Sequence, residues 1–234
     1  MHVRQILTAS VATAGLALSA TADATNLSFT GTFSKDDDVQ LFNFTVSTAS
    51  LVKLISFSYA GGVNAAGSTI PEGGFDPILT LFDASGAFIG RNDDGGDGDP
   101  AGSCPVPTSA VTNAQFDTCF ESTLNPGNYI VAIQQFDNFH VGNLSDGFMS
   151  PSGSGPTFTS RFGCTNGQFC DVAGITGTDI NGNPIGMSFN RTNAWAFDIL
   201  NVDTATVVPL PATVWFLATG IAGLVLRSRR RAVG

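Results

Sequence analysis

Apolar and polar residues alternate along several short stretches of the chain. The clearest case is 40–47, where Phe42, Phe44 and Val46 are separated by polar residues. Because successive side chains of a β-strand point to opposite faces, this period of two predicts a half-buried strand. The stretch 51–59 is apolar on both faces near its start, which favours a central strand. Further strands are predicted at 27–33, 78–82, 87–89, 115–123, 129–136 and 195–202.

Turn sequences between these stretches indicate how the strands connect. Residues 83–86 (DASG) join two predicted strands and indicate a hairpin, and residues 124–128 (LNPGN) indicate a second one. The stretch 195–202 is expected to be the last strand. About eight strands, with no convincing helical pattern between the two ends of the chain, predict an all-β fold. We expect a β-sandwich of the jelly-roll-like kind.

Residues 137–193 lack this pattern and are rich in Gly, Ser, Asn, Pro and Thr. An irregular stretch of this length is unusual inside a domain and indicates a functional insertion or a mobile region. The body, residues 25–206, is therefore predicted to be one sandwich domain with a long loop-rich insertion before its last strand.

The N-terminus has the three parts of a secretory signal peptide. Arg4 supplies the positive charge, 6–18 is a short apolar run, and Ala22-Asp23-Ala24 offers a cleavage site between small residues. Residues 1–24 are therefore predicted to be removed during export.

The C-terminus carries a longer apolar run, 212–226, which is uncharged. With the valines before it, this run approaches the roughly 20 residues that a transmembrane helix needs. The basic residues that follow predict a cytoplasmic flank. They are Arg227, Arg229, Arg230 and Arg231.

A short motif precedes this run and consists of Val208, Pro209, Leu210, Pro211 and Ala212. Motif, apolar helix and terminal arginines, in this order over 207–234, resemble the PEP-CTERM sorting signal in its VPLPA form. The resemblance implies recognition by an exosortase-type membrane protease. It also implies a destination at the cell surface or extracellular matrix of a Gram-negative bacterium that produces exopolysaccharide. A permanent membrane anchor is the alternative.

The body carries a second set of motifs, FDPILTLFD at 75–83, NDDGG at 92–96 and PGNY at 126–129. Over 27–136 their order resembles the bacterial pre-peptidase C-terminal domain, a compact β-sandwich appended to secreted proteases and other surface proteins. The resemblance implies a binding or accessory module without a catalytic centre. The insertion and the strand after it depart from the family's pattern.

The charge of the chain is uneven, with a formal net charge of −9 and half of the basic residues at the two ends. The acidic body argues against nucleic acid as a partner and favours a cation. A Gly-rich loop at 92–100 concentrates carboxylates, and Ca²⁺ takes six to eight oxygen ligands. The candidate ligands are Asp93, Asp94, Asp97 and Asp99, with Asp76 or Asp83 approaching from the neighbouring hairpin. The alternative is that these side chains cap turns. We expect Asp36-Asp37-Asp38 to form a solvated turn rather than a ligand cluster.

The sequence contains four cysteines, Cys104, Cys119, Cys164 and Cys170. Three pairings are possible, and proximity in the sequence favours Cys104–Cys119 and Cys164–Cys170. A metal site is the alternative, but no C-x-x-C is present, and disulfides are preferred in an exported chain.

Catalytic signals are few. His140 is the only histidine outside the predicted signal peptide, and there is no G-x-S-x-G. We therefore expect a non-enzymatic surface or matrix protein, in contact with exopolysaccharide or other matrix proteins and with the membrane at least transiently. A calcium-dependent carbohydrate- or protein-binding module is the first alternative. A secreted hydrolase that uses His140 or an acidic pair is a weaker one.

Overall fold

The computed structural model describes residues 24–95, 104–149, 155–182 and 184–209. The predicted signal peptide, the apolar run 212–226 and the terminal arginines lie outside these residues, apart from Ala24. Within the described ranges, no helix is both long and apolar enough to cross a membrane.

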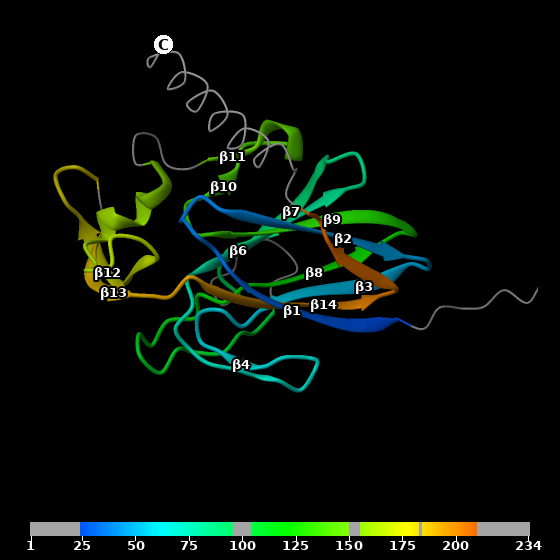
Figure 1. Ribbon diagram of the computed structural model, residues 1–234, viewed down its shortest axis with the longest axis horizontal. Helices are drawn as coiled ribbons and strands as arrows, with labels where there is room; N and C mark the ends of the chain where they lie inside the picture. The colour runs from blue at the N-terminus through cyan, green and yellow to red at the C-terminus, as the bar shows by residue number, and fades with distance from the viewer. Residues whose placement is uncertain (1–23, 96–103, 150–154, 183, 210–234) are drawn as a thin grey trace, which may run out of the picture.

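Two antiparallel sheets pack face to face and form a β-sandwich (Figure 1). The first sheet has the order β1 (Thr25–Thr32), β14 (Ala194–Val202), β3 (Ser50–Ser56) and β8 (Cys119–Leu124). The second sheet has the order β15 (Thr204–Val207), β2 (Val39–Val46), β9 (Gly127–Gln135), β6 (Pro77–Asp83) and β7 (Phe88–Asn92). The all-β prediction is confirmed, and β3 is a central strand as expected.

The core lies between the sheets and is built from the predicted alternation. Phe42 and Phe44 of β2 are buried, while Asn43 between them is exposed. The ring of Phe42 meets that of Phe197 on β14 edge-on, with centroids 4.8 Å apart, and so joins the two sheets. Buried aromatic rings in this arrangement add to the burial of apolar surface.

The connection between β8 and β9 differs from the predicted hairpin. β8 pairs with β3 in the first sheet, whereas β9 pairs with β2 and β6 in the second. The turn at 124–128 therefore carries the chain from one sheet to the other. The predicted first residue of β8 was also too early, since the strand begins at Cys119.

The stretch 195–202 is not the last strand, because β15 follows it and pairs with β2. The pairing continues into the sorting motif. The Val208 N–H donates to Leu41 O at 2.9 Å, and Gln40 Nε2 donates to Val208 O at 3.1 Å. The body thus extends past the predicted boundary at 206. Of the motif, Val208 and Pro209 are described, and Leu210 and the residues after it are not.

The insertion contains regular structure that the sequence analysis did not predict. Its elements are β10 (Phe139–His140), η1 (Leu144–Asp146), β11 (Phe148–Met149), η2 (Gly155–Phe162), β12 (Cys170–Thr178) and β13 (Pro184–Asn190). β12 and β13 form a hairpin at one end of the sandwich, on the left in Figure 1. A small hairpin of β4 (Gly62–Val63) and β5 (Thr69–Ile70) was also not predicted.

Asp36 does not lie in a solvated turn. Asp38 does cap one, since its carboxylate accepts hydrogen bonds from the N–H groups of Ser34 and Lys35. Asp36 is instead fully buried and accepts hydrogen bonds from Thr159 N–H at 2.8 Å and Phe169 N–H at 2.7 Å. Its burial raises the pKa of this carboxyl group. Asp36 therefore fastens the insertion to the loop between β1 and β2.

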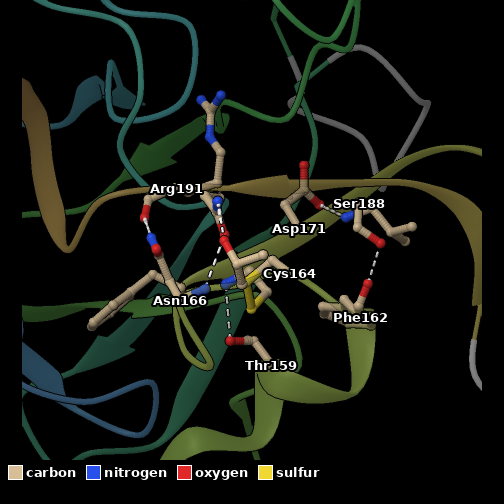
Figure 2. Close-up of a disulfide and its surroundings, with 12 residues drawn as sticks. Thr159, Phe162, Cys164, Asn166, Asp171, Ser188 and Arg191 are labelled. Carbon is tan, nitrogen blue, oxygen red and sulfur yellow. Dashed lines mark hydrogen bonds between the residues drawn. A yellow bond between two sulfur atoms is a disulfide. The ribbon is translucent and has the colours of Figure 1, made fainter.

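Both disulfides pair as predicted. Cys104–Cys119 joins the segment after β7 to the start of β8, with the two Cα atoms 5.2 Å apart. Cys164–Cys170 joins the segment after η2 to the start of β12, with a Cα separation of 5.5 Å (Figure 2). Two disulfides are typical of proteins from oxidising compartments.

Candidate metal site

Three of the predicted ligands come together at one edge of the second sheet. Asp76 directly precedes β6, and Asp93 and Asp94 directly follow β7. β6 and β7 are antiparallel neighbours, so the start of one strand and the end of the other lie side by side. Carboxylate oxygens of the three residues lie within 4.8 Å of one another. This spacing suits a single hard cation with oxygen ligands.

Asp76 is the buried member of the cluster. It is 5% exposed, and its Oδ1 atom has no hydrogen-bond partner among the described residues. Burial raises the pKa of Asp76 well above its usual range, and the nearby carboxylates of Asp94 and Asp93 raise it further. A divalent cation at this point would neutralise the charges and provide the missing partner.

The two residues just before β8 hold the site in place. The hydroxyl of Thr118 lies 2.7 Å from Pro77 O and 2.8 Å from Asp93 O, so it contacts both chain segments of the cluster. Gly95 N–H donates to Asp117 O at 2.9 Å. A Cβ atom at position 95 would overlap the side chain of Val106, so a glycine is needed immediately after Asp94.

Gln135 offers a further oxygen that the sequence analysis missed. It is 1% exposed, and its Oε1 atom has no hydrogen-bond partner among the described residues. Gln135 pairs with Pro77 in the sheet and so lies beside the residue that follows Asp76. The signal was present in the alternation of β9, where Val131 and Ile133 face the core and Gln135 is the next residue on that face.

Two more buried carboxylates surround the cluster. Asp117 accepts hydrogen bonds from Ser56 Oγ at 2.6 Å and Ala60 N–H at 2.8 Å. Asp171 on β12 accepts a hydrogen bond from the hydroxyl of Tyr59. Burial raises the pKa of both groups, and their charges add to the rise at Asp76. The site is therefore a concentration of buried negative charge.

Of the other predicted ligands, Asp83 does not join the cluster. Asp83 lies at the opposite end of β6, where its carboxylate accepts hydrogen bonds from Ser85 N–H at 2.8 Å and Ala87 N–H at 2.9 Å. It caps the turn between β6 and β7. Asp97 and Asp99 lie outside the described residues.

His140 stands in an aromatic environment. Its ring stacks on Phe88 with centroids 4.1 Å apart and meets Phe82 edge-on at 6.1 Å. Burial lowers the pKa of His140, and the charge of Arg91 lowers it further. These contacts account for the position of the His140 ring by packing.

Comparison of the sequence with models of known protein families finds no match, and comparison with curated protein sequences finds none either.

Proposed function

We propose that this protein is an exported, non-enzymatic β-sandwich protein of the cell surface or extracellular matrix that binds a calcium ion at Asp76, Asp93 and Asp94. The calcium part is carried by one observation, the buried carboxylate of Asp76 within ligand distance of two others. The two disulfides support export, because such bonds persist in oxidising compartments.

The finer parts of the proposal rest on the sequence resemblances. The segment 207–234 would be recognised by an exosortase-type protease, and exopolysaccharide or other matrix proteins would be the partners of the body. Mass spectrometry of the native protein from separated cell fractions tests the sorting part. A chain that ends before Ala212 in the outer fractions supports sorting, whereas peptides through Arg227 at the inner membrane contradict it.

Thermal unfolding tests the calcium part. Calcium at 100 times its dissociation constant would stabilise the folded state by about 2.7 kcal/mol. For a domain of this size we expect a rise in Tm of roughly 5 to 10 °C, from 2 to 4 °C for each kcal/mol. The comparison is between CaCl₂ and EGTA, with MgCl₂ as a second cation. Mg²⁺ should have the smaller effect because it demands stricter octahedral geometry.

A pair of matched variants separates a specific site from general screening of negative charge. Asp76→Asn removes the buried carboxylate and should abolish the shift. Glu121→Gln removes the same charge from a partly exposed ion pair with Lys53 and should leave the shift unchanged. Equal shifts in both variants, or no shift in the unaltered protein, would contradict the calcium site.

A further inference from the structure

Both ends of the insertion are fastened to the four residues that lead into β6. Just before its start, Phe136 N–H donates to Asp76 O at 2.8 Å. At its end, Thr192 N–H donates to Gly73 O at 2.7 Å, and Arg191 Nε donates to Gly74 O at 2.9 Å. The segment 73–76 that receives these bonds ends in the buried carboxylate of the candidate metal site.

Arg191 extends this connection into the insertion. Its side chain is buried, and its guanidinium group lies 3.7 Å from the centre of the Tyr59 ring and donates to Tyr59 O. The hydroxyl of Tyr59 in turn donates to Asp171 on β12. In Figure 2, Asp171 lies on β12 and Arg191 lies just after β13, and the disulfide of Cys164 is nearby. The insertion therefore docks through buried polar groups.

One of these groups has the same charge as the candidate metal site. Asp171 belongs to the insertion and Asp76 to the sandwich, both carboxylates are buried, and the charge of Asp171 helps to raise the pKa of Asp76. Like charges repel most strongly where water is excluded. Without a cation, placing the two carboxylates at this junction costs free energy, which the raised pKa of Asp76 reflects. With a divalent cation at Asp76, the same junction becomes attractive to Asp171.

We propose that a calcium ion at Asp76, Asp93 and Asp94 locks the insertion onto the sandwich, an inference that rests on the calcium site proposed above. In the calcium-bound protein, β12, β13 and the end of the insertion at Arg191 are held closely against the segment 73–76. In the calcium-free protein, this junction opens more often while the sandwich stays folded. The ion thereby controls how well ordered the insertion is.

Hydrogen exchange of the full-length chain, purified in a mild detergent, tests the proposal. Peptides from 155–192 are followed in CaCl₂ and in EGTA, with peptides from β2 and β9 as an internal reference. We expect calcium to slow exchange in 155–192 at least about tenfold, and to slow the reference peptides much less. Equal slowing of both regions would contradict a local lock.

Variants of the insertion sharpen the test. Asp171→Asn removes the repulsion, so 155–192 should be protected in EGTA almost as well as in CaCl₂, while calcium still binds by titration calorimetry. Asp179→Asn removes a charge from the exposed tip of the same hairpin and should keep the full calcium dependence. A calcium dependence in Asp171→Asn equal to that of the unaltered protein would overturn the proposal.

Calorimetry also separates the two proposals. If calcium binds but exchange in 155–192 is the same in CaCl₂ and EGTA, the lock is wrong and the calcium site stands. If no calcium binds, the site is wrong and the lock is wrong with it. Should Asp171→Asn fail to fold, Asp76→Asn serves instead. It should protect 155–192 in EGTA and show no response to calcium.

Discussion

The sandwich and the insertion are held together by different kinds of interaction. The sandwich encloses a continuous apolar core in which Phe42, Leu54 and Phe197 are fully buried. Among the described residues, the insertion has a small cluster of its own around Phe162 and Val172, and it contributes Phe169 to the core of the sandwich. It is attached largely by buried polar side chains, among them Asp36 and Arg191, whose bonds join residues far apart in the sequence.

The difference teaches which perturbations each region should resist. Apolar burial is non-directional and little affected by charge, whereas buried polar groups lose free energy as soon as one partner is removed. The sandwich should therefore respond mainly to lost volume, and the insertion mainly to altered charge and hydrogen bonding. The following variants test this contrast, from the largest expected effect to the smallest.

Phe42→Ala should be the most damaging change. Its ring lies 4.7 Å from Phe29 and 4.8 Å from Phe197, so truncation leaves a cavity between the two sheets. We expect a loss of about 3 to 5 kcal/mol in the free energy of unfolding, measured by urea denaturation. Leu51→Ala is the control, because Leu51 is 52% exposed on β3 and should cost less than about 1 kcal/mol. Similar losses for both variants would argue against the core as described.

Removing the two disulfides separately compares the regions directly. Cys104–Cys119 spans 15 residues and should contribute about 3 kcal/mol, whereas Cys164–Cys170 spans 6 and should contribute about 2 kcal/mol. Paired Cys→Ser variants are measured by urea denaturation and by limited proteolysis. Loss of Cys164–Cys170 should expose the insertion to cleavage and leave the sandwich intact. Simultaneous cleavage of both regions would show that they unfold as one unit.

Asp36→Ala should release the insertion with a smaller cost. Two buried N–H groups, of Thr159 and Phe169, lose their acceptor, and the loss is partly offset because a buried charge disappears. We expect about 2 kcal/mol and faster hydrogen exchange in 155–170. Asp36→Asn keeps one acceptor oxygen and should recover part of the protection. No change in exchange for Asp36→Ala would mean that the insertion is held elsewhere.

Acidity should have the smallest effect. Burial raises the pKa values of Asp36, Asp117 and Asp198. The folded protein then binds more protons than the unfolded chain from about pH 4 upwards, so stability in EGTA should fall as pH rises through these pKa values. We expect a higher Tm at pH 5.0 than at pH 7.5, and a reversed order would contradict it.

His140 changes the stability of the protein with pH in the opposite direction. Burial lowers its pKa, so the unfolded chain binds more protons at pH 5, and stability is lost there. His140→Gln should therefore enlarge the gain in Tm at pH 5.0. Asp83 does not contribute in this range, because its hydrogen bond from Ser85 lowers its pKa and the group is ionised in both states. A smaller gain in the His140→Gln variant would show that His140 is not buried as described.

Local patterns predicted the parts of the fold that depend on local geometry. Alternation located β2 and the buried face of β14, and the sequence DASG located the turn that Asp83 caps. Proximity in the sequence was sufficient for both disulfides. The cluster of Asp76, Asp93 and Asp94 followed from the same hairpin, because a hairpin brings the start of one strand beside the end of the next.

The rest depends on partners that are distant in sequence. The turn at 124–128 reverses the chain but does not determine which sheet each flanking strand joins. β15 has only four residues and takes its place from the free edge of β2. The order of the insertion comes from Asp36 and Arg191, whose bonds join residues 133 and 117 positions apart. No periodic pattern in the insertion itself carries that information.

The direct passage from β15 into Val208 has a mechanical consequence. Thr25, at the start of the sandwich, pairs with Val202, which lies just before the first residue of β15. Val207 is at the other end of β15. A force that draws the two ends of the body apart would therefore run along the strands. The hydrogen bonds between β15 and β2 would then be loaded together in shear rather than opened one after another. The sandwich would then transmit tension to Val208 through paired strands rather than through a flexible linker.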